Sequence, residues 1–320
     1  MTSLMSRLVL LGLAVAPTLG AQSAATIAAR VAGAADGEVR MTYTARPDAC
    51  GDGGESISFG DSFRVSDSRE WNGASSGSGC VHGPARVALT VRDHQVIAVH
   101  PHVAGRWPAG DAVLDLGTVP AAQAAAYFVS LASKVPERRP QRGSLLAAVL
   151  ADSAAIAPDL QRLARDGSVP AVSALGMLEE KGVPALMDVA RSGNENVRKS
   201  AVFWLGQSDE PPARAVVRSV IDDARETVAV RRAAIFAYGQ RTSGASVADL
   251  VSLYDHLREP RLREHVIFVL SQRDEESATD ALMDIARRDD DRAMRSKAFF
   301  WLAQKNDPRV AKMITDIVTH

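Results

Sequence analysis

The chain has 320 residues, a formal net charge of −1, and 23% charged residues whose signs are mixed along the sequence. This length favours two domains. The neutral, mixed surface excludes nucleic acid as an expected partner, because phosphate binding requires a basic patch, and it gives no reason to expect attraction to anionic lipid.

Residues 1–21 have the features of a secretory signal peptide. Arg7 supplies a positive start, Leu8–Ala16 is an apolar stretch of the right length, and small residues lead to Ala21, where we expect cleavage. An uncleaved N-terminal anchor is the alternative. No later segment has 18 consecutive apolar residues, so we expect a mature chain without a transmembrane segment, in the periplasm or outside the cell.

The two cysteines, Cys50 and Cys80, both lie in the N-terminal half. In an oxidising compartment two such thiols most often pair. A disulfide closing a loop of this size contributes roughly 3–4 kcal/mol. A metal site is the rival interpretation, although neither cysteine has a CxxC or CxxH neighbour.

Residues 37–135 are predicted to form a small, mostly antiparallel β domain that ends in a helix. Val39, Met41 and Tyr43 alternate with polar residues, as in a half-buried strand. Further strands are expected at 57–59, 63–65, 86–92, 96–102 and 112–116, and a helix at 121–135. The Ala-rich residues 22–36 are compatible with a short helix or a flexible leader. Prolines and arginines around 135–143 predict a domain boundary, with 136–159 as a linker or a helix leading into the next domain.

Four segments of the C-terminal half align without gaps. They start at Val197, Val230, Leu262 and Met294, which are 33, 32 and 32 residues apart. Three columns are invariant: an Arg column (Arg198, Arg231, Arg263, Arg295), a Phe column (Phe203, Phe236, Phe268, Phe300) and a Gln column (Gln207, Gln240, Gln272, Gln304). Each segment is predicted to be the second helix of a pair, with first helices at 183–191, 213–221, 247–257, 278–287 and 309–318. Stacked pairs of this kind form an α-solenoid.

This pattern resembles HEAT repeats, close to the variant of phycobilisome-lyase-like proteins, over about residues 160–320. The family's Val-Arg pair matches Val197-Arg198 and Val230-Arg231, and becomes Leu262-Arg263 and Met294-Arg295 in the later copies. The family's acidic residue in the preceding turn, which builds a ladder between repeats, is matched loosely by Glu195, Glu226, Glu259 and Asp291. A degenerate extra repeat is expected from Leu160 to Glu179. The fold class is therefore α+β with two domains, a β-rich N-terminal one and a helical solenoid.

Two patterns carry possible chemistry in the β domain. Gly73, Ser75 and Gly77 match GxSxG, but they lie in a Ser/Gly-rich loop without the strand and helix that a nucleophile elbow needs. His100 and His102 lie two apart on an expected strand, and His82 or His94 would complete a metal site. We expect all four histidines to be ordinary polar residues, because no ligand-spacing motif supports a site.

The repeat columns are predicted to be structural. The Gln amides are placed to bond free carbonyls in the last helical turn. The column of Gly206, Gly239, Ser271 and Ala303 is expected to permit either close approach of helices or helix termination. Trp204 and Trp301 share a column and are expected in the core, with binding anchors as the alternative.

These features favour a non-catalytic, exported scaffold that binds a protein partner and carries no cofactor. The resemblance implies the same role, because HEAT proteins mostly mediate protein–protein contacts. One alternative is a metal- or ligand-binding β domain carried by a structural solenoid. The other is a lyase-like enzyme accessory, since related HEAT proteins attach bilins, but no nucleophile or bilin pocket is recognisable here.

Overall fold

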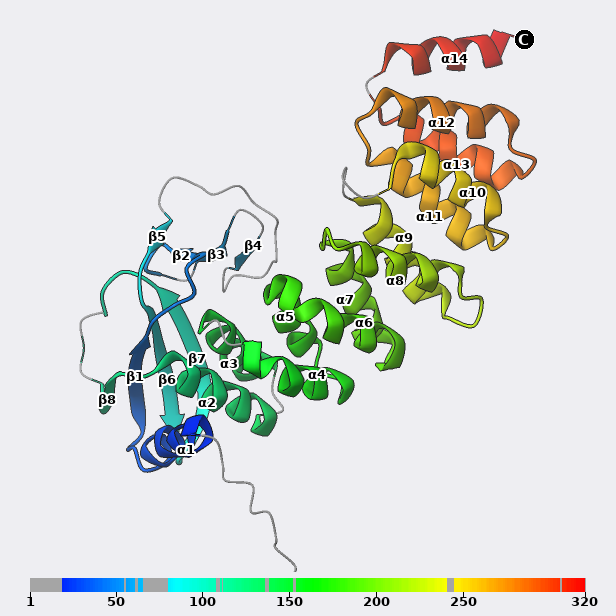
Figure 1. The fold of residues 1–320 in the computed structure, drawn as a ribbon. Coiled ribbons are helices and arrows are strands. Elements are labelled where there is room, and N and C mark those ends of the chain that lie inside the picture. The colour runs from blue at the N-terminus through cyan, green and yellow to red at the C-terminus, as the bar shows by residue number, and fades with distance from the viewer. Residues whose placement is uncertain are drawn as a thin grey trace, which may run out of the picture.

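The computed structural model describes residues 19–54, 56–60, 63–65, 80–107, 110, 112–135, 138–151, 154–240, 245–305 and 307–319. A β-rich part is followed by a long stack of paired helices (Figure 1). The predicted signal peptide lies outside the described residues, except for its last three, which begin helix α1 (Leu19–Ala32). The GxSxG segment at 73–77 also lies outside them.

The larger sheet has the strand order β7-β6-β1-β8. Its strands are β1 (Gly37–Tyr43), β6 (Ala85–Arg92), β7 (Gln95–Val103) and β8 (Leu114–Thr118). Val39, Met41 and Tyr43 are fully buried, which confirms the predicted alternation of β1. The pairs β1–β6 and β6–β7 are antiparallel and β1–β8 is parallel, so the sheet is mostly antiparallel as predicted.

A hairpin joins the predicted strands β6 and β7 through Asp93 and His94. Both residues have positive φ, 50° and 60°. Two consecutive left-handed residues make a type I′ turn, whose twist matches that of the strands it connects. The turn pairs Arg92 with Gln95 and Val91 with Val96, and a bulge between Val91 and Thr90 then shifts the register by one residue, so that Leu89 pairs with Val99.

A smaller sheet has the order β4-β3-β2-β5. Its strands are β2 (Ala49–Gly51), β3 (Ile57–Phe59), β4 (Phe63–Val65) and β5 (Val81–His82). The predicted disulfide joins Cys50 in β2 to Cys80 beside β5, with the two Cα atoms 5.3 Å apart. It closes a loop with a sequence separation of 30 and links the neighbouring strands β2 and β5 at one edge of the small sheet.

Helices α1, α2 (Ala121–Lys134) and α3 (Arg138–Leu150) connect the sheets to the helical stack. Helix α3 packs against β7 on one side and against α5 (Val169–Met177) on the other. Gly143 permits the contact with β7, because a Cβ atom there would lie 2.2 Å from the Val99 carbonyl oxygen. The Tyr43 hydroxyl donates to the Ala147 carbonyl at 2.5 Å. The segment predicted as a linker or leading helix is thus a buried helix shared by both parts.

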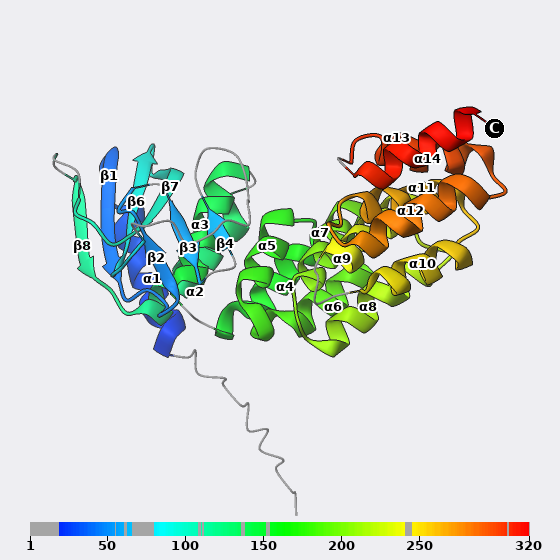
Figure 2. The ribbon, with the colours of Figure 1, turned by 90° about the horizontal axis from the view of Figure 1, so that it is seen from above.

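The repeats form two rows of helices (Figure 2). The first helices of the repeats, called A helices here, are α6 (Val183–Ser192), α8 (Pro211–Asp222), α10 (Val247–His256), α12 (Glu276–Arg288) and α14 (Pro308–Thr319). The second helices, called B helices, are α7 (Glu195–Gly206), α9 (Val228–Gln240), α11 (Pro260–Ser271) and α13 (Arg292–Leu302). Before them, α4 (Ala157–Arg165) and α5 pack as one more pair, which confirms the degenerate repeat.

Small residues set the spacing of the B row. A Cβ atom at Gly206 would lie 2.6 Å from the Ala237 Cβ, and one at Gly239 would lie 2.4 Å from the Val269 side chain. Real Cβ atoms do not approach that closely, so both glycines are required for the observed packing. The predicted role of this column in close helix approach is confirmed at these two positions.

Candidate protein-binding surface on the B helices

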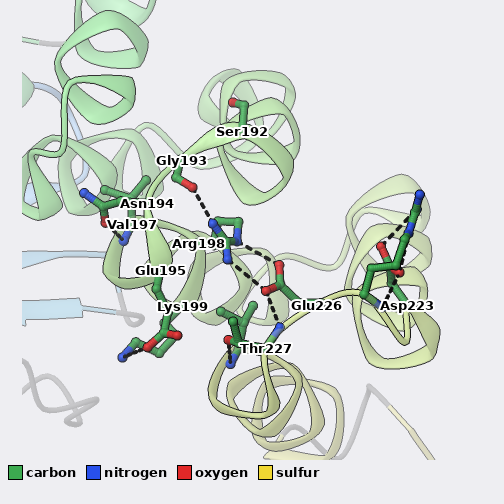
Figure 3. Close-up of polar contacts among 12 residues, drawn as sticks. Ser192, Gly193, Asn194, Glu195, Val197, Arg198, Lys199, Asp223, Glu226 and Thr227 are labelled. Carbon is green, nitrogen blue, oxygen red and sulfur yellow. Dashed lines mark hydrogen bonds and ion pairs between the residues drawn. The ribbon is translucent and has the colours of Figure 1, made fainter.

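The Arg column has a structural role, seen most clearly at Arg198 (Figure 3). The Arg198 guanidinium donates to the Gly193 carbonyl at 2.6 Å, which caps the end of α6. Its Nε and Nη2 donate to the two carboxylate oxygens of Glu226 at 2.7 and 2.8 Å, and Glu226 lies in the turn before α9. Burial alone would raise the pKa of Glu226, but hydrogen bonds from Arg198 and the Thr227 amide outweigh it and hold the pKa below its usual value.

Each of the other three arginines in the column makes one of these two kinds of contact, either with a carbonyl at the end of an A helix or with a carboxylate of the next repeat. Arg231 donates to the Ile221 carbonyl at 2.8 Å and Arg295 to the Asp289 carbonyl at 2.5 Å, so both satisfy carbonyls at the end of their own A helix. Arg263 donates at 2.5 Å to the Asp289 carboxylate in the next repeat. Asp289 therefore takes the ladder role that the resemblance assigned to Asp291, and Asp291 instead caps α13.

The Phe column lies on the outer side of the B row. Phe203, Phe236 and Phe268 are partly exposed, and the Phe300 side chain is 58% exposed. The Phe236 and Phe268 rings stack with centroids 6.5 Å apart, and the centroids of the Phe268 and Trp301 rings are 5.3 Å apart. The column thus makes a nearly continuous aromatic strip over the last three B helices. We call the Phe column together with Trp301 the aromatic strip.

The two tryptophans of one sequence column have different environments. Trp204 is 5% exposed and its ring lies over Gly176 of α5, where a Cβ atom would be 2.1 Å away. Trp301 is partly exposed between Phe268 and Phe300. Trp204 is therefore a core residue, as predicted, whereas Trp301 belongs to the surface and suits the alternative of a binding anchor.

The Gln column lies one turn beyond the aromatic strip. Gln304 donates to the Phe300 carbonyl at 3.3 Å, which is the bond predicted from the sequence. Gln207 instead donates to the Gln240 side chain of the next repeat at 3.2 Å, and Gln272 donates to the neighbouring Ser271 hydroxyl. These amides contribute polar groups at repeat spacing along the same face.

A basic column directly after the glutamines was missed from the sequence. Buried Arg273 donates to the Gly239 and Ala245 carbonyls of the preceding repeat, at 2.9 and 3.3 Å. Lys305, one repeat later, donates to the Arg273 carbonyl at 2.6 Å. The sequence does contain this pattern, because residues 241, 273 and 305, which are 32 residues apart, are all basic.

His265 is the titratable group in contact with the aromatic strip. Its ring stacks on Phe268 with centroids 5.5 Å apart. Burial, followed by the nearby charge of Arg232, lowers the pKa of His265 to about 4. The imidazole is therefore neutral at pH 7. Lys297, which follows His265 in the same sequence column, is paired with Glu264 at 2.5 Å.

The four histidines considered as metal ligands are not brought together as a site. His94 lies in the turn before β7 and His102 near its far end, about 26 Å along an extended strand. His82, His94 and His102 each bond a different backbone carbonyl, of Ala49, Ala32 and Gly54. Within the described ranges, no three His, Cys, Asp or Glu side chains form a metal-sized cluster.

Two buried arginines of the β-rich part were also missed. Arg86 donates to the Ala104 and Arg106 carbonyls in the loop after β7 and to the Gly53 carbonyl in the loop after β2, so it holds these two loops together. Arg46 donates to the Met177 carbonyl at the end of α5 at 2.6 Å. These partners are backbone groups far away in the sequence, so no residue pattern could have identified them.

Comparison with known proteins locates the repeats. Residues 224–303 match the family described as HEAT repeats. No curated protein sequence matches. Human deoxyhypusine hydroxylase in complex with glycerol has 15% identity and a TM-score of 0.31, over 59% of this chain and 77% of that one. The complex of CpcE and CpcF of phycocyanin lyase from Nostoc sp. PCC7120 has 20% identity and a TM-score of 0.27, over 51% of this chain and 98% of that one.

These structural likenesses are too distant to bear on activity. Among the described helices, none has the length and apolar composition needed to cross a membrane. The stacked helix pairs, their Arg and Phe columns and the family match agree on the architecture of the C-terminal half. Residues 224–303 are a HEAT-repeat region, which is preceded by further HEAT-like helix pairs and followed by the helix α14.

Proposed function

We propose that this protein is an exported, non-catalytic scaffold whose aromatic strip binds an apolar segment of a partner protein. The observation that carries the proposal is the partial exposure of the strip, with Phe300 as its most exposed member. An exposed row of large apolar side chains is stabilised when a partner covers it. Aromatic side chains at the centre of an interface also supply most of its binding energy.

The length of the strip suits an extended contact. Four B helices with a spacing of about 8–10 Å give a surface roughly 25–30 Å long. The Gln column adds amide donors and acceptors beside the rings, so an apolar segment can keep its backbone hydrogen-bonded while its side chains cover the phenylalanines. The Arg column takes no part in the proposed contact, since its guanidinium groups are used within the solenoid.

Export is the second part of the proposal. The features of residues 1–21 support it, and so does the Cys50–Cys80 disulfide, because such bonds persist in oxidising compartments. Cell fractionation followed by N-terminal sequencing tests it. Recovery from the envelope with a new N-terminus near Ala21 would support export, and recovery from the cytoplasm with Met1 intact would contradict it.

In-cell crosslinking with a matched pair of variants tests the surface. Phe300→Glu puts a charge on the strip, and Ile97→Glu puts one on β7, where the side chain is 41% exposed. Tagged wild type and both variants would be crosslinked in cells, and captured proteins quantified by mass spectrometry. We expect one partner to be retained by Ile97→Glu and lost with Phe300→Glu. Capture that survives in both variants would show that the strip is not the recognition surface.

A further inference from the structure

Helices α10 and α12 lie next to each other in the row of A helices (Figure 2), whereas the aromatic strip belongs to the B helices. A groove lies between α10 and α12. Its volume is about 1080 Å³. The residues lining it recur at helical spacing on both walls, so the groove follows the two helices along their length. This surface is separate from the one in the proposed function.

The floor of the groove is apolar. Val247 and Val251, one turn apart on α10, face Ala281 and Ile285, one turn apart on α12. Val247, Val251 and Ala281 are partly exposed, whereas Ile285 is 8% exposed at the bottom. Two parallel apolar stripes of this spacing form the kind of surface that takes the apolar face of a third helix.

The size of the groove agrees with such an occupant. Helix α10 has 10 residues and is therefore about 15 Å long. A helix with a diameter of about 10 Å and that length fills roughly 1200 Å³. About three turns of helix would thus lie along the groove, with one face against the floor and the other in solvent.

The charges around the groove indicate which kind of helix it can bind. Five carboxylates and only two guanidinium groups, those of Arg273 and Arg288, are among the residues that line the groove. The carboxylates are those of Asp255, Glu275, Asp280, Asp284 and Asp289. Glu275 and Asp289 have short bonds within the protein, to Arg273 and Arg263.

The rim is formed by Asp255 on α10 and by Asp280 and Asp284 on α12, all exposed. Asp280 and Asp284 contact arginines, Arg309 at 2.9 Å and Arg288 at 3.7 Å, but exposed pairs of this kind are weak and can be exchanged for other cations. An apolar floor under an acidic rim is complementary to a helix with one apolar face and flanking Lys or Arg residues. We infer that the α10–α12 groove docks a basic amphipathic helix of a partner protein.

A defined peptide pair tests this inference on the full mature chain. The probe is a fluorescein-labelled peptide of about 14 residues, built from Leu and Lys in a helical pattern and carrying one photoreactive residue. The control peptide replaces every Lys by Glu. Binding is followed by fluorescence anisotropy at about 0.05 and 0.3 M salt, and crosslinked sites are mapped by mass spectrometry.

Three protein variants locate the site. Val251→Glu charges the floor and Asp284→Lys reverses one rim charge. Asp159→Lys is the matched control, because Asp159 is an exposed acid paired with an arginine of its own helix, Arg162, but lies on α4. Circular dichroism melting confirms that each variant is folded.

We expect the Lys peptide to crosslink to α10 and α12 and to bind more weakly at the higher salt concentration. Val251→Glu and Asp284→Lys should each weaken it about tenfold, a change in binding free energy of about 1.4 kcal/mol, and Asp159→Lys should leave it unchanged. The inference is overturned if the Lys peptide does not bind or if the Glu peptide binds equally well. Equal weakening by Asp159→Lys, or crosslinks concentrated on the aromatic strip, would also overturn it.

Discussion

Replacing Arg46 by alanine should weaken the connection between the β-rich part and the helical stack. The Arg46 side chain is 7% exposed and reaches from the segment after β1 to the end of α5. There it donates to the Met177 carbonyl at 2.6 Å. It also makes a two-pronged pair with Asp48 and lies over the Phe59 ring, 5.3 Å from the ring centroid.

The magnitude follows from these three contacts. Loss of a charged donor leaves the carbonyl of a buried residue unsatisfied, which costs about 2 kcal/mol. The contact with the Phe59 ring contributes about 0.5–1 kcal/mol. Asp48 is 33% exposed, so its pair contributes less than about 1 kcal/mol and its carboxylate can be hydrated in the variant. We therefore expect a loss of about 3 kcal/mol in the free energy of unfolding.

Urea unfolding followed by circular dichroism measures this loss. Arg225→Ala is the control, because Arg225 is 91% exposed and pairs only with its neighbour Asp223 among the contacts of the described residues. That variant should leave the free energy of unfolding essentially unchanged. The stability loss in Arg46→Lys should lie between those of Arg46→Ala and Arg225→Ala, since lysine keeps the charge but cannot donate two parallel hydrogen bonds to a carboxylate. A loss below about 1 kcal/mol in Arg46→Ala would refute the reasoning.

Reduction of the Cys50–Cys80 bond should destabilise the protein by about 3–4 kcal/mol, which would lower its Tm in the presence of reductant. A Cys50→Ser, Cys80→Ser double variant should show the same lower Tm in the absence of reductant. The lowered pKa of Glu226 means that its pair with Arg198 stabilises the fold above the usual carboxylate pKa and is lost as pH falls through the folded value. Glu226→Gln should therefore lower the free energy of unfolding by about 1–2 kcal/mol at pH 7, and below about pH 4.5 the stability of this variant in urea should depend less on pH than that of the wild type. An equal pH dependence in both proteins would contradict this. The pKa of His265 is also lowered, so stability should fall by about 1 kcal/mol, after allowance for solvent screening, between pH 7 and pH 5. His265→Gln should remove that part of the slope, and an equal slope in both proteins would contradict the assignment.

The repeats could be predicted from sequence because their constraints recur. Val197, Val230 and Leu262 occupy the same buried position in successive helices, so each copy reinforces the pattern of the others. The strands β2 and β5 were not predicted, because β2 contains only the small residues Ala49–Gly51 and β5 has two residues, so neither shows the apolar alternation that marks β3 and β4. Their pairing depends on the disulfide and on contacts with distant segments.

The function of individual columns was harder to predict. A shared column does not guarantee a shared environment, as Trp204 and Trp301 show, because each repeat has different neighbours on its two sides. Arg263 likewise bonds Asp289 rather than the acid expected from the pattern, since the turn before α13 places that carboxylate within reach. Sequence spacing specifies which face of a helix a residue occupies, whereas its partner depends on the local geometry of the turn.

The sharing of α3 between the sheet and α5 gives the two ends of the solenoid unequal protection. A linear stack of helix pairs is held only by contacts between neighbours, so its terminal pairs open most readily. At the N-terminal end, α5 of the first described pair packs against α3, and α3 in turn packs against β7 of the larger sheet. The described helix pairs next to α3 should therefore open later than those farther along the stack, and the β-rich part sets this order without any change in the repeats themselves.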